Sequence, residues 1–226
     1  MMNLLIEKFP EFLIVNGVEC PVKWDFRTVL KCNEIIESAE ELTGDSLLKV
    51  LLLFYRDCDY FTEEHVDKMF WFFSCGKEQS KKKFPRKIAG VNDKQPFDFQ
   101  EDAGLIYAGF IQQYGIDLQA EEMHWWKFML LLENLGEDTR LSKVIEYRTM
   151  DVSNKNLSKE EREFYRAMQK YYGLNQAPAM DDRTRQIEDA LLNGGDVSEL
   201  LRVIRQIKRC LFRQIKTGLS EHLTME

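Results

Sequence analysis

The segment from Phe97 to Arg148 constrains the fold of this chain more than any other part of the sequence. Within it, apolar residues recur at the spacing of one helix face, at Ala103, Ile106, Tyr107, Phe110, Ile111 and Tyr114. Glycine readily adopts the left-handed conformation in which helices end, so Gly115 is expected to terminate this helix. The segment therefore predicts a helical core, and none of these residues makes a reactive centre.

The Trp125-Trp126 pair lies in a second helix predicted from the same segment. Between residues 123 and 132, eight of the ten side chains are apolar, and only His124 and Lys127 interrupt them. A helix that is apolar on nearly every side is buried. Both tryptophans are therefore expected to pack in the core rather than to form a binding platform.

Two short apolar runs near the N-terminus predict a β-hairpin. Residues 12–15 and 18–22 flank Asn16-Gly17, the dipeptide that best fits a type I′ turn. A lone hairpin is marginally stable, so it is expected to lie on the helices that follow or to pair with another chain. Helix starts are predicted at the capping residues Asp25, Thr62, Asp138 or Thr139, and Ser158, and Asp45 and Ser46 introduce the apolar run 47–55.

The expected fold is mainly α, with an N-terminal β-hairpin packed on a multi-helix bundle and a C-terminal helical extension. The first helix is expected over Phe26–Leu42, and the apolar run 47–55 is expected to be buried centrally. Residues 1–175 are predicted to form the hairpin and helical core domain. A polar linker at 176–182 then separates this domain from an extension at 183–226.

Composition and charge argue against several classes of protein. The net charge of −7 is unlike that of a nucleic-acid-binding protein, which needs a basic face. The chain has no apolar run long enough to span a membrane, and its N-terminus does not resemble a signal peptide. Its five cysteines are scattered and odd in number, so they are expected to be free thiols in a reducing cytoplasm.

The sequence contains no recognisable pattern for catalysis or for metal binding. Gly76-Lys77 lacks the other residues of a phosphate-binding loop. The three histidines (His65, His124 and His222) are far apart, and Cys58 and His65 are interpreted as a structural or accidental pair. The chain is therefore expected to be non-enzymatic, with no cofactor and no metal.

Arg148 shares a helix face with apolar residues, so its charge requires a partner. Asp102, Asp117 and Asp151 are the candidate carboxylates. The pair is expected to be structural rather than catalytic.

Three segments are candidates for binding a protein partner. Trp71 and Phe72 lie off the apolar stripe of their helix, and a lysine-rich connector follows them with Lys81, Lys82 and Lys83. A predicted last helix, 197–216, carries an apolar seam that includes Leu200, Ile204, Ile207 and Leu211, flanked by basic residues that include Arg205, Lys208 and Arg209. This helix is either a packed helix with a solvated basic face, or a docking element for an acidic helical partner or a second copy.

Several short motifs of the sequence resemble those of the "gene product fifteen" family of siphophage proteins from phages of Gram-positive bacteria. The resemblance is carried by residues 25–28 (DFRT), 97–99 (FDF), 102–110 (DAGLIYAGF), 113–118 (QYGIDL), 124–128 (HWWKF), Tyr147-Arg148 with Asp151, and 188–192 (EDALL). Together with the segment 189–201 that contains the last of them, these motifs span residues 25–201, most of the chain. The chain continues from Arg202 to Glu226, so the resemblance implies nothing for the basic last helix.

The resemblance implies a tail assembly chaperone of the host cytoplasm that is absent from the mature virion. Such a chaperone would bind the helical tape-measure protein and keep it soluble while tail-tube subunits polymerise around it. Self-association would be a further interaction. The alternatives are a structural tail or tail-completion protein of the virion and, less favoured, a nucleic-acid-binding regulator. The acidic composition argues against the regulator.

Overall fold

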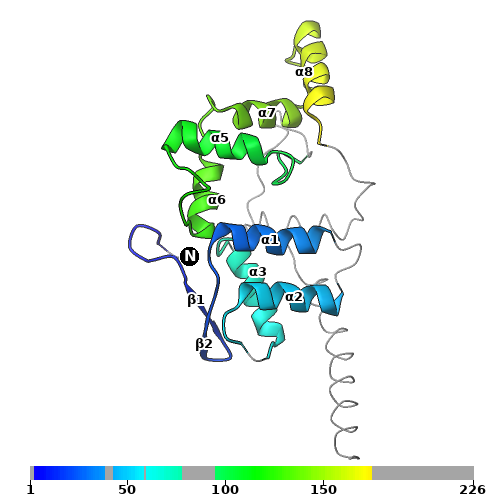
Figure 1. Ribbon diagram of the computed structural model, residues 1–226. Helices are drawn as coiled ribbons and strands as arrows, with labels where there is room; N and C mark the ends of the chain where they lie inside the picture. Colours follow the sequence, from blue (N-terminus) through cyan, green and yellow to red (C-terminus); the bar gives the residue numbers. More distant parts are fainter. Residues whose placement is uncertain (1–2, 39–42, 59, 78–94, 175–226) are drawn as a thin grey trace, which may run out of the picture. The chain divides into compact units, whose positions relative to one another are not determined.

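The computed structural model describes residues 3–38, 43–58, 60–77 and 95–174 (Figure 1). In these ranges the chain is mainly helical with one two-stranded antiparallel sheet at its N-terminal end, which confirms the predicted fold class. The described residues form two compact units. The first unit comprises residues 3–77 and the segment 124–126, and the second comprises residues 95–123 and 127–174. The predicted linker at 176–182 and the extension at 183–226 lie outside the described residues.

The hairpin of the first unit consists of β1 (Phe12–Val15) and β2 (Val18–Pro21). Its turn places Asn16 and Gly17 at positive φ angles of 50° and 78°, as a type I′ turn requires. Backbone hydrogen bonds also join the end of β2 to the chain after the second helix, from Lys23 to Phe54 at 2.8 Å and from Arg56 to Pro21 at 2.9 Å. The hairpin is thus anchored to the helices of its own unit, and β1 packs against the third helix.

The helices of the first unit are α1 (Phe26–Glu37), α2 (Gly44–Phe54) and α3 (Glu63–Phe73). Asp25 caps α1 as predicted, by accepting a hydrogen bond from the backbone N–H of Arg27. The first helix ends at Glu37, before the predicted Leu42.

Helix α2 begins at Gly44 and is capped by Thr43, so Asp45 and Ser46 lie in its first turn, before the apolar run. Thr43 and Ser46 form a reciprocal capping box, in which each hydroxyl oxygen accepts from the backbone N–H of the other residue. This pairing satisfies two backbone donors that the first turn of the helix leaves without partners.

The side chains of Trp125 and Trp126 hold the C-terminal end of α3. The last carbonyl groups of a helix have no hydrogen-bond donor within the helix, so their donors must come from elsewhere. Trp125 Nε1 donates to the Phe73 carbonyl oxygen at 2.8 Å, and Trp126 Nε1 donates to the Phe72 carbonyl oxygen at 2.8 Å. Both tryptophans are 2% exposed, which confirms their predicted place in the core.

Gly76, in the turn that follows α3, lies against the rings of Trp126 and Trp71. Its φ angle is +67°, which side chains with a Cβ atom rarely adopt. A Cβ atom at this position would lie 2.8 Å from the Trp126 ring and 3.1 Å from the Trp71 ring. The glycine is therefore required both by the backbone conformation and by the close packing of the two indoles.

Between residues 95 and 174 the structure describes four further helices: α5 (Ala103–Tyr114), α6 (Trp125–Glu133), α7 (Arg140–Thr149) and α8 (Lys159–Tyr172). Gly115 ends α5 at a φ angle of 66°, as predicted. Thr139 caps α7, and Ser158 forms the predicted capping box with Glu161 at the start of α8. In the second unit, α7 packs against both α5 and α8.

The core of the second unit contains Phe110 of α5 stacked on Phe128, with ring centroids 5.2 Å apart. Ile106 and Phe110 are buried, whereas Ile111 is 44% exposed, so the buried stripe of α5 is narrower than predicted. No helix in the described ranges is long and apolar enough to cross a lipid bilayer.

The first prediction concerns Trp126→Ala. The variant should lower the free energy of unfolding by about 3–5 kcal/mol, because it removes a buried ring and leaves the Phe72 carbonyl short of a donor. Urea denaturation followed by far-ultraviolet circular dichroism would measure the change. Trp71→Ala is the control and should cost less, since Trp71 is 37% exposed. A loss within about 0.5 kcal/mol for Trp126→Ala would contradict the burial of this ring.

Candidate functional site

The structure corrects one of the predicted partner-binding residues and retains another. Phe72 is fully buried, and its ring packs against Phe54, His124 and Trp126 at centroid distances of 5.2–5.9 Å. The prediction that Phe72 presents apolar surface to a partner is therefore wrong, because a second layer of side chains covers that face of α3. Trp71 remains 37% exposed, with the edge of its ring packed on Trp126.

The other predicted partner-binding residues cannot be placed in the described structure. The connector lysines Lys81, Lys82 and Lys83 lie outside the described residues. The predicted last helix also lies outside them, with its seam residues Leu200, Ile204, Ile207 and Leu211 and its basic residues Arg205, Lys208 and Arg209.

The outer face of the hairpin is an exposed apolar surface that was not identified from the sequence. Phe12 and Ile14 alternate along β1 with the buried Leu13 and Val15, and they are 48% and 47% exposed. Val18, at the start of β2, is 62% exposed. Among the described residues β1 pairs with β2 alone, so its other edge also carries backbone groups that no strand covers. We call Phe12 and Ile14 the outer hairpin face. Val18 pairs with the buried Val15 and therefore belongs to the opposite face, where it is exposed at the end of the hairpin.

Helix α2 carries a smaller exposed apolar pair. Leu48 and Leu52 lie four residues apart on the same side of the helix and are 38% and 55% exposed. The prediction that the run 47–55 is buried on nearly every side is wrong for these two residues. The rest of the unit covers one face of α2, which buries Leu47, Val50, Leu51 and Phe54.

His124 is a buried histidine that directly precedes the tryptophan pair. Its ring stacks between Phe9 and Trp24, with centroids 4.8 Å and 5.7 Å away. Nε2 lies 3.0 Å from the Pro10 carbonyl oxygen, and Nδ1 accepts a hydrogen bond from the Trp126 backbone N–H at 3.0 Å. These two contacts define a neutral ring with its proton on Nε2. Burial also lowers the pKa of His124 below its usual value, which the Pro10 carbonyl partly opposes.

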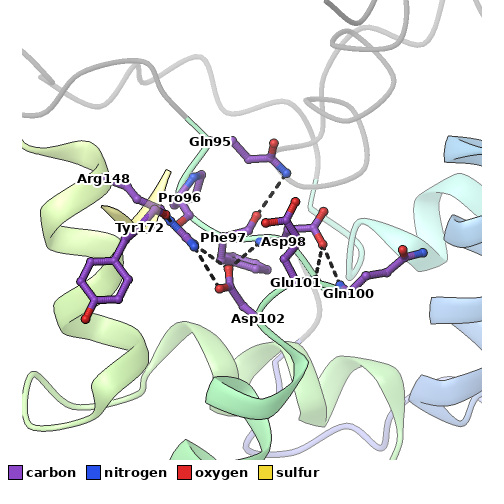
Figure 2. A network of polar contacts seen from close by, with 9 residues as sticks. All are labelled: Gln95, Pro96, Phe97, Asp98, Gln100, Glu101, Asp102, Arg148 and Tyr172. Atoms are coloured by element: carbon purple, nitrogen blue, oxygen red, sulfur yellow. Dashed lines mark hydrogen bonds and ion pairs between the residues drawn. The ribbon is translucent and has the colours of Figure 1, made fainter. Parts of the chain in front are cut away.

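The ion pair between Arg148 and Asp102 is the most densely bonded polar site of the second unit (Figure 2). Arg148 Nη1 and Nη2 donate to the two carboxylate oxygens of Asp102 at 2.6 Å and 3.0 Å. Arg148 also donates to the carbonyl oxygens of Tyr172 and Pro96, and Asp102 accepts from the backbone N–H of Asp98. The structure thus selects Asp102 from the three predicted carboxylates.

Burial makes this ion pair a structural anchor. Arg148 and Asp102 are 6% and 3% exposed, so each charge depends on the other and on the surrounding carbonyl and N–H groups. The contacts connect the start of α5, the end of α7 and the end of α8 (Figure 2). Nε, Nη1 and Nη2 of Arg148 each donate to a protein oxygen. The site is therefore suited to holding the three helix ends together.

Three potential metal ligands that are distant in sequence converge in the first unit. The ligand atoms of Cys20, Cys58 and His65 all lie within 4.8 Å of one another. The sequence suggested Cys58 and His65 as a structural pair but gave no reason to add Cys20. The register of the hairpin is what places Cys20 here, since Cys20 pairs with the inward-facing Leu13 and therefore shares its buried face.

The second prediction concerns Asp102→Asn. Removing this negative charge should lower the free energy of unfolding by about 3–5 kcal/mol, because the buried Arg148 guanidinium loses its counter-charge. Urea denaturation would measure the effect. Asp151→Asn, at one of the carboxylates that Arg148 does not use, is the matched control and should have a smaller effect. Equal effects of the two variants would show that the ion pair is not the anchor.

The third prediction concerns pH. Burial lowers the pKa of His124 and of His65 from the usual 6.5, so between that value and the lower folded pKa the unfolded chain binds more protons than the folded chain. Stability should therefore fall as the pH decreases below about 6.5. The carboxyl groups with lowered pKa values act at lower pH, since the usual value for Glu161 is 4.5 and those for Asp117 and Asp151 are 3.8.

Denaturation curves at several pH values between about 5 and 7.5 would test this expectation. His124→Gln should reduce the slope of stability against pH across that window, whatever its effect on stability at neutral pH. A wild-type stability that stays constant or rises on acidification would contradict the neutral, buried state of both histidines.

Comparison with known proteins identifies the family. Residues 5–174 match the family described as Bacteriophage Gp15 protein. The match ends before the motif at residues 188–192, which formed part of the resemblance. No curated protein and no solved structure matches the chain. Because the match covers most of the 226 residues, the chain belongs to the bacteriophage Gp15 family and is a phage protein with a structural or assembly-related role.

Proposed function

We propose that this chain is a non-enzymatic tail assembly chaperone, which binds the helical tape-measure protein and keeps it soluble in the host cytoplasm during tail assembly. Tail-tube subunits would be further partners, and self-association would be a second interaction. Family membership supports the phage assembly context. The observation that carries the binding role is the outer hairpin face, an exposed apolar surface on a folded unit.

The physical reason for the proposal is the behaviour of long apolar stripes in water. A tape-measure protein with exposed stripes aggregates unless another surface covers them. The outer hairpin face offers Phe12 and Ile14 for such contact, and Trp71 offers an aromatic side chain of the kind enriched at protein interfaces. Such contacts would gain apolar burial without requiring a matching polar pattern.

Polar sites of the two units serve the fold in this proposal. The ring nitrogens of His124 contact backbone groups, and the guanidinium of Arg148 contacts Asp102 and two carbonyl oxygens. General acid–base catalysis requires a side chain that can reach a reacting group. The proposal assigns these residues to stability rather than to chemistry.

Co-expression with the tape-measure protein encoded by the same phage tests the proposal. The tape-measure protein should be found mainly in the insoluble fraction when expressed alone, and in the soluble fraction in complex with this chain when the two are expressed together. Equal solubility with and without the chain would contradict chaperone activity.

Mass spectrometry of purified phage particles distinguishes the proposal from a structural role. A chaperone should be absent from mature particles, whereas a tail or tail-completion protein should be present. A gel-shift assay at physiological salt would identify a nucleic-acid-binding regulator, because that function requires tight binding under those conditions.

The fourth prediction concerns the surface that binds. Phe12→Asp combined with Ile14→Asp should reduce recovery of the tape-measure protein in pull-downs by at least about tenfold, equivalent to about 1.4 kcal/mol. Both side chains are half-exposed, so the melting temperature should change little. Leu48→Asp with Leu52→Asp on α2 is the matched control and should retain binding.

A third double variant tests the surface predicted from sequence alone. Ile204→Asp with Ile207→Asp removes the apolar seam of the predicted last helix. If this variant loses the tape-measure protein while the hairpin variant retains it, the C-terminal seam rather than the outer hairpin face is the docking surface.

A further inference from the structure

The side chains of Cys20, Cys58 and His65 form a compact group of soft ligand atoms. All three ligand atoms lie within 4.8 Å of one another, and Cys20 Sγ is 3.7 Å from His65 Nε2. In a tetrahedral zinc site, bond lengths of about 2.3 Å to sulfur and about 2.0–2.1 Å to nitrogen place these two atoms about 3.6 Å apart. The Cys20–His65 distance already matches that spacing, and a small side-chain movement would bring Cys58 to it.

Thr62 fixes the orientation of the His65 ring. His65 Nδ1 lies 2.9 Å from Thr62 Oγ1 and 3.1 Å from the Thr62 backbone nitrogen. Because the Thr62 backbone N–H donates to Nδ1, the neutral ring carries its proton on Nε2 in this structure. A metal ion on Nε2 would require the other neutral tautomer, in which Nδ1–H donates to Thr62 Oγ1 in place of the contact with the backbone N–H. Metal-bound histidines commonly donate their second ring N–H to an oxygen in this way.

Aromatic side chains enclose the histidine from the other side. Tyr55 and Phe61 contact the His65 ring with centroids 5.2 Å and 5.6 Å away, and the Tyr55 hydroxyl donates to the His65 carbonyl oxygen at 2.6 Å. These contacts leave the ring little freedom to rotate.

Cys58 provides access for an ion. Cys20 and His65 are buried, whereas Cys58 is partly exposed and lines a surface hollow of about 330 Å³. The same hollow is also lined by Tyr55, by Asp57 and by the two basic residues Lys23 and Arg56. An ion could enter from this side and keep a water molecule as its fourth ligand.

We propose that Cys20, Cys58 and His65 form a zinc-binding site with two thiolate ligands and one imidazole ligand. Thiolate and imidazole together favour Zn²⁺ over Mg²⁺ or Ca²⁺, which prefer oxygen ligands. Neither Cys20 nor Cys58 forms a disulfide among the described residues. The proposal is independent of the tail assembly function.

Zinc at this site would join three separate segments of the first unit. Cys20 belongs to β2, Cys58 follows α2, and His65 lies in the first turn of α3. The ion would cross-link the hairpin to both helices. Its binding free energy would then add to the stability of the folded state, since the unfolded chain does not hold the three ligands together.

Metal analysis of the full chain, purified in a phosphine reductant, tests the proposal. Protein equilibrated with Zn²⁺ and passed through a desalting column should retain about one ion per chain. Replacement by Co²⁺ should give the thiolate-to-metal charge-transfer band and the visible absorption of a tetrahedral site. Zn²⁺ should also raise the melting temperature.

Variants assign the ligands. Cys58→Ser should weaken Zn²⁺ binding by more than the about 10- to 100-fold that loss of an outer hydrogen-bond partner costs. Thr62→Val should weaken it within that range, and Thr62→Ser should restore it because the hydroxyl group is kept. Cys75→Ser, a cysteine outside the group, is the matched control and should bind as the wild type does.

Two results would overturn the proposal. The first is wild-type protein that retains no zinc under these reducing conditions. The second is zinc binding that Cys58→Ser leaves unchanged, because the metal would then be held by other residues. Because Cys58 is partly exposed, Cys58→Ser should fold, and its circular dichroism spectrum would confirm this.

Discussion

The first unit depends on how the C-terminal end of α3 is closed. Helices leave their last carbonyl groups without partners, and burying such a group unbonded costs about 1–3 kcal/mol. Here the indole N–H groups of Trp125 and Trp126 reach the carbonyl oxygens of Phe73 and Phe72. The apolar rings thereby fill the core while their single polar atoms satisfy the helix end. This double use explains why two adjacent tryptophans are both buried.

The position of the tryptophans depends in turn on His124. The residue pairs with Asp25 in an isolated β-bridge, and the Trp125 backbone N–H donates to the Trp24 carbonyl oxygen at 2.8 Å. The His124 ring is fixed between Phe9 and Trp24 and accepts from the Trp126 backbone N–H. Residues 124–126 therefore join the first unit through backbone pairing as well as through side-chain packing. The histidine that interrupts the apolar run is an organising residue of the core.

Much of the fold follows from local patterns, whereas the contacts between distant segments do not. The turn at Asn16-Gly17, the helix end at Gly115 and the capping box at Ser158 are set by neighbouring residues, so the sequence predicted them. The burial of Phe72 depends on residues 124–126, which follow it by about fifty positions in the printed sequence. Helical periodicity cannot reveal a second layer of this kind.

Candidate sites show the same division between local and distant information. The need of Arg148 for a carboxylate followed from its apolar neighbours, but the choice of Asp102 depended on how α5 and α7 pack. Cys20, Cys58 and His65 come from three segments, so no spacing motif could group them. The outer hairpin face could in part have been predicted. A two-stranded sheet has two faces, and packing on the helices covers only one of them.

The outer hairpin face can serve as a docking surface because the turn and inner face of the hairpin are held in place. The backbone N–H of Asn16 donates to Glu64 Oε2 at 2.8 Å, and its side chain donates to Thr62 Oγ1 at 3.2 Å. The turn is thus tied to the start of α3, next to the ring of His65. A surface that is already ordered loses less conformational entropy on binding than a mobile one. Contacts on the inner side of the hairpin thereby support binding on its outer side, where Phe12 and Ile14 remain exposed.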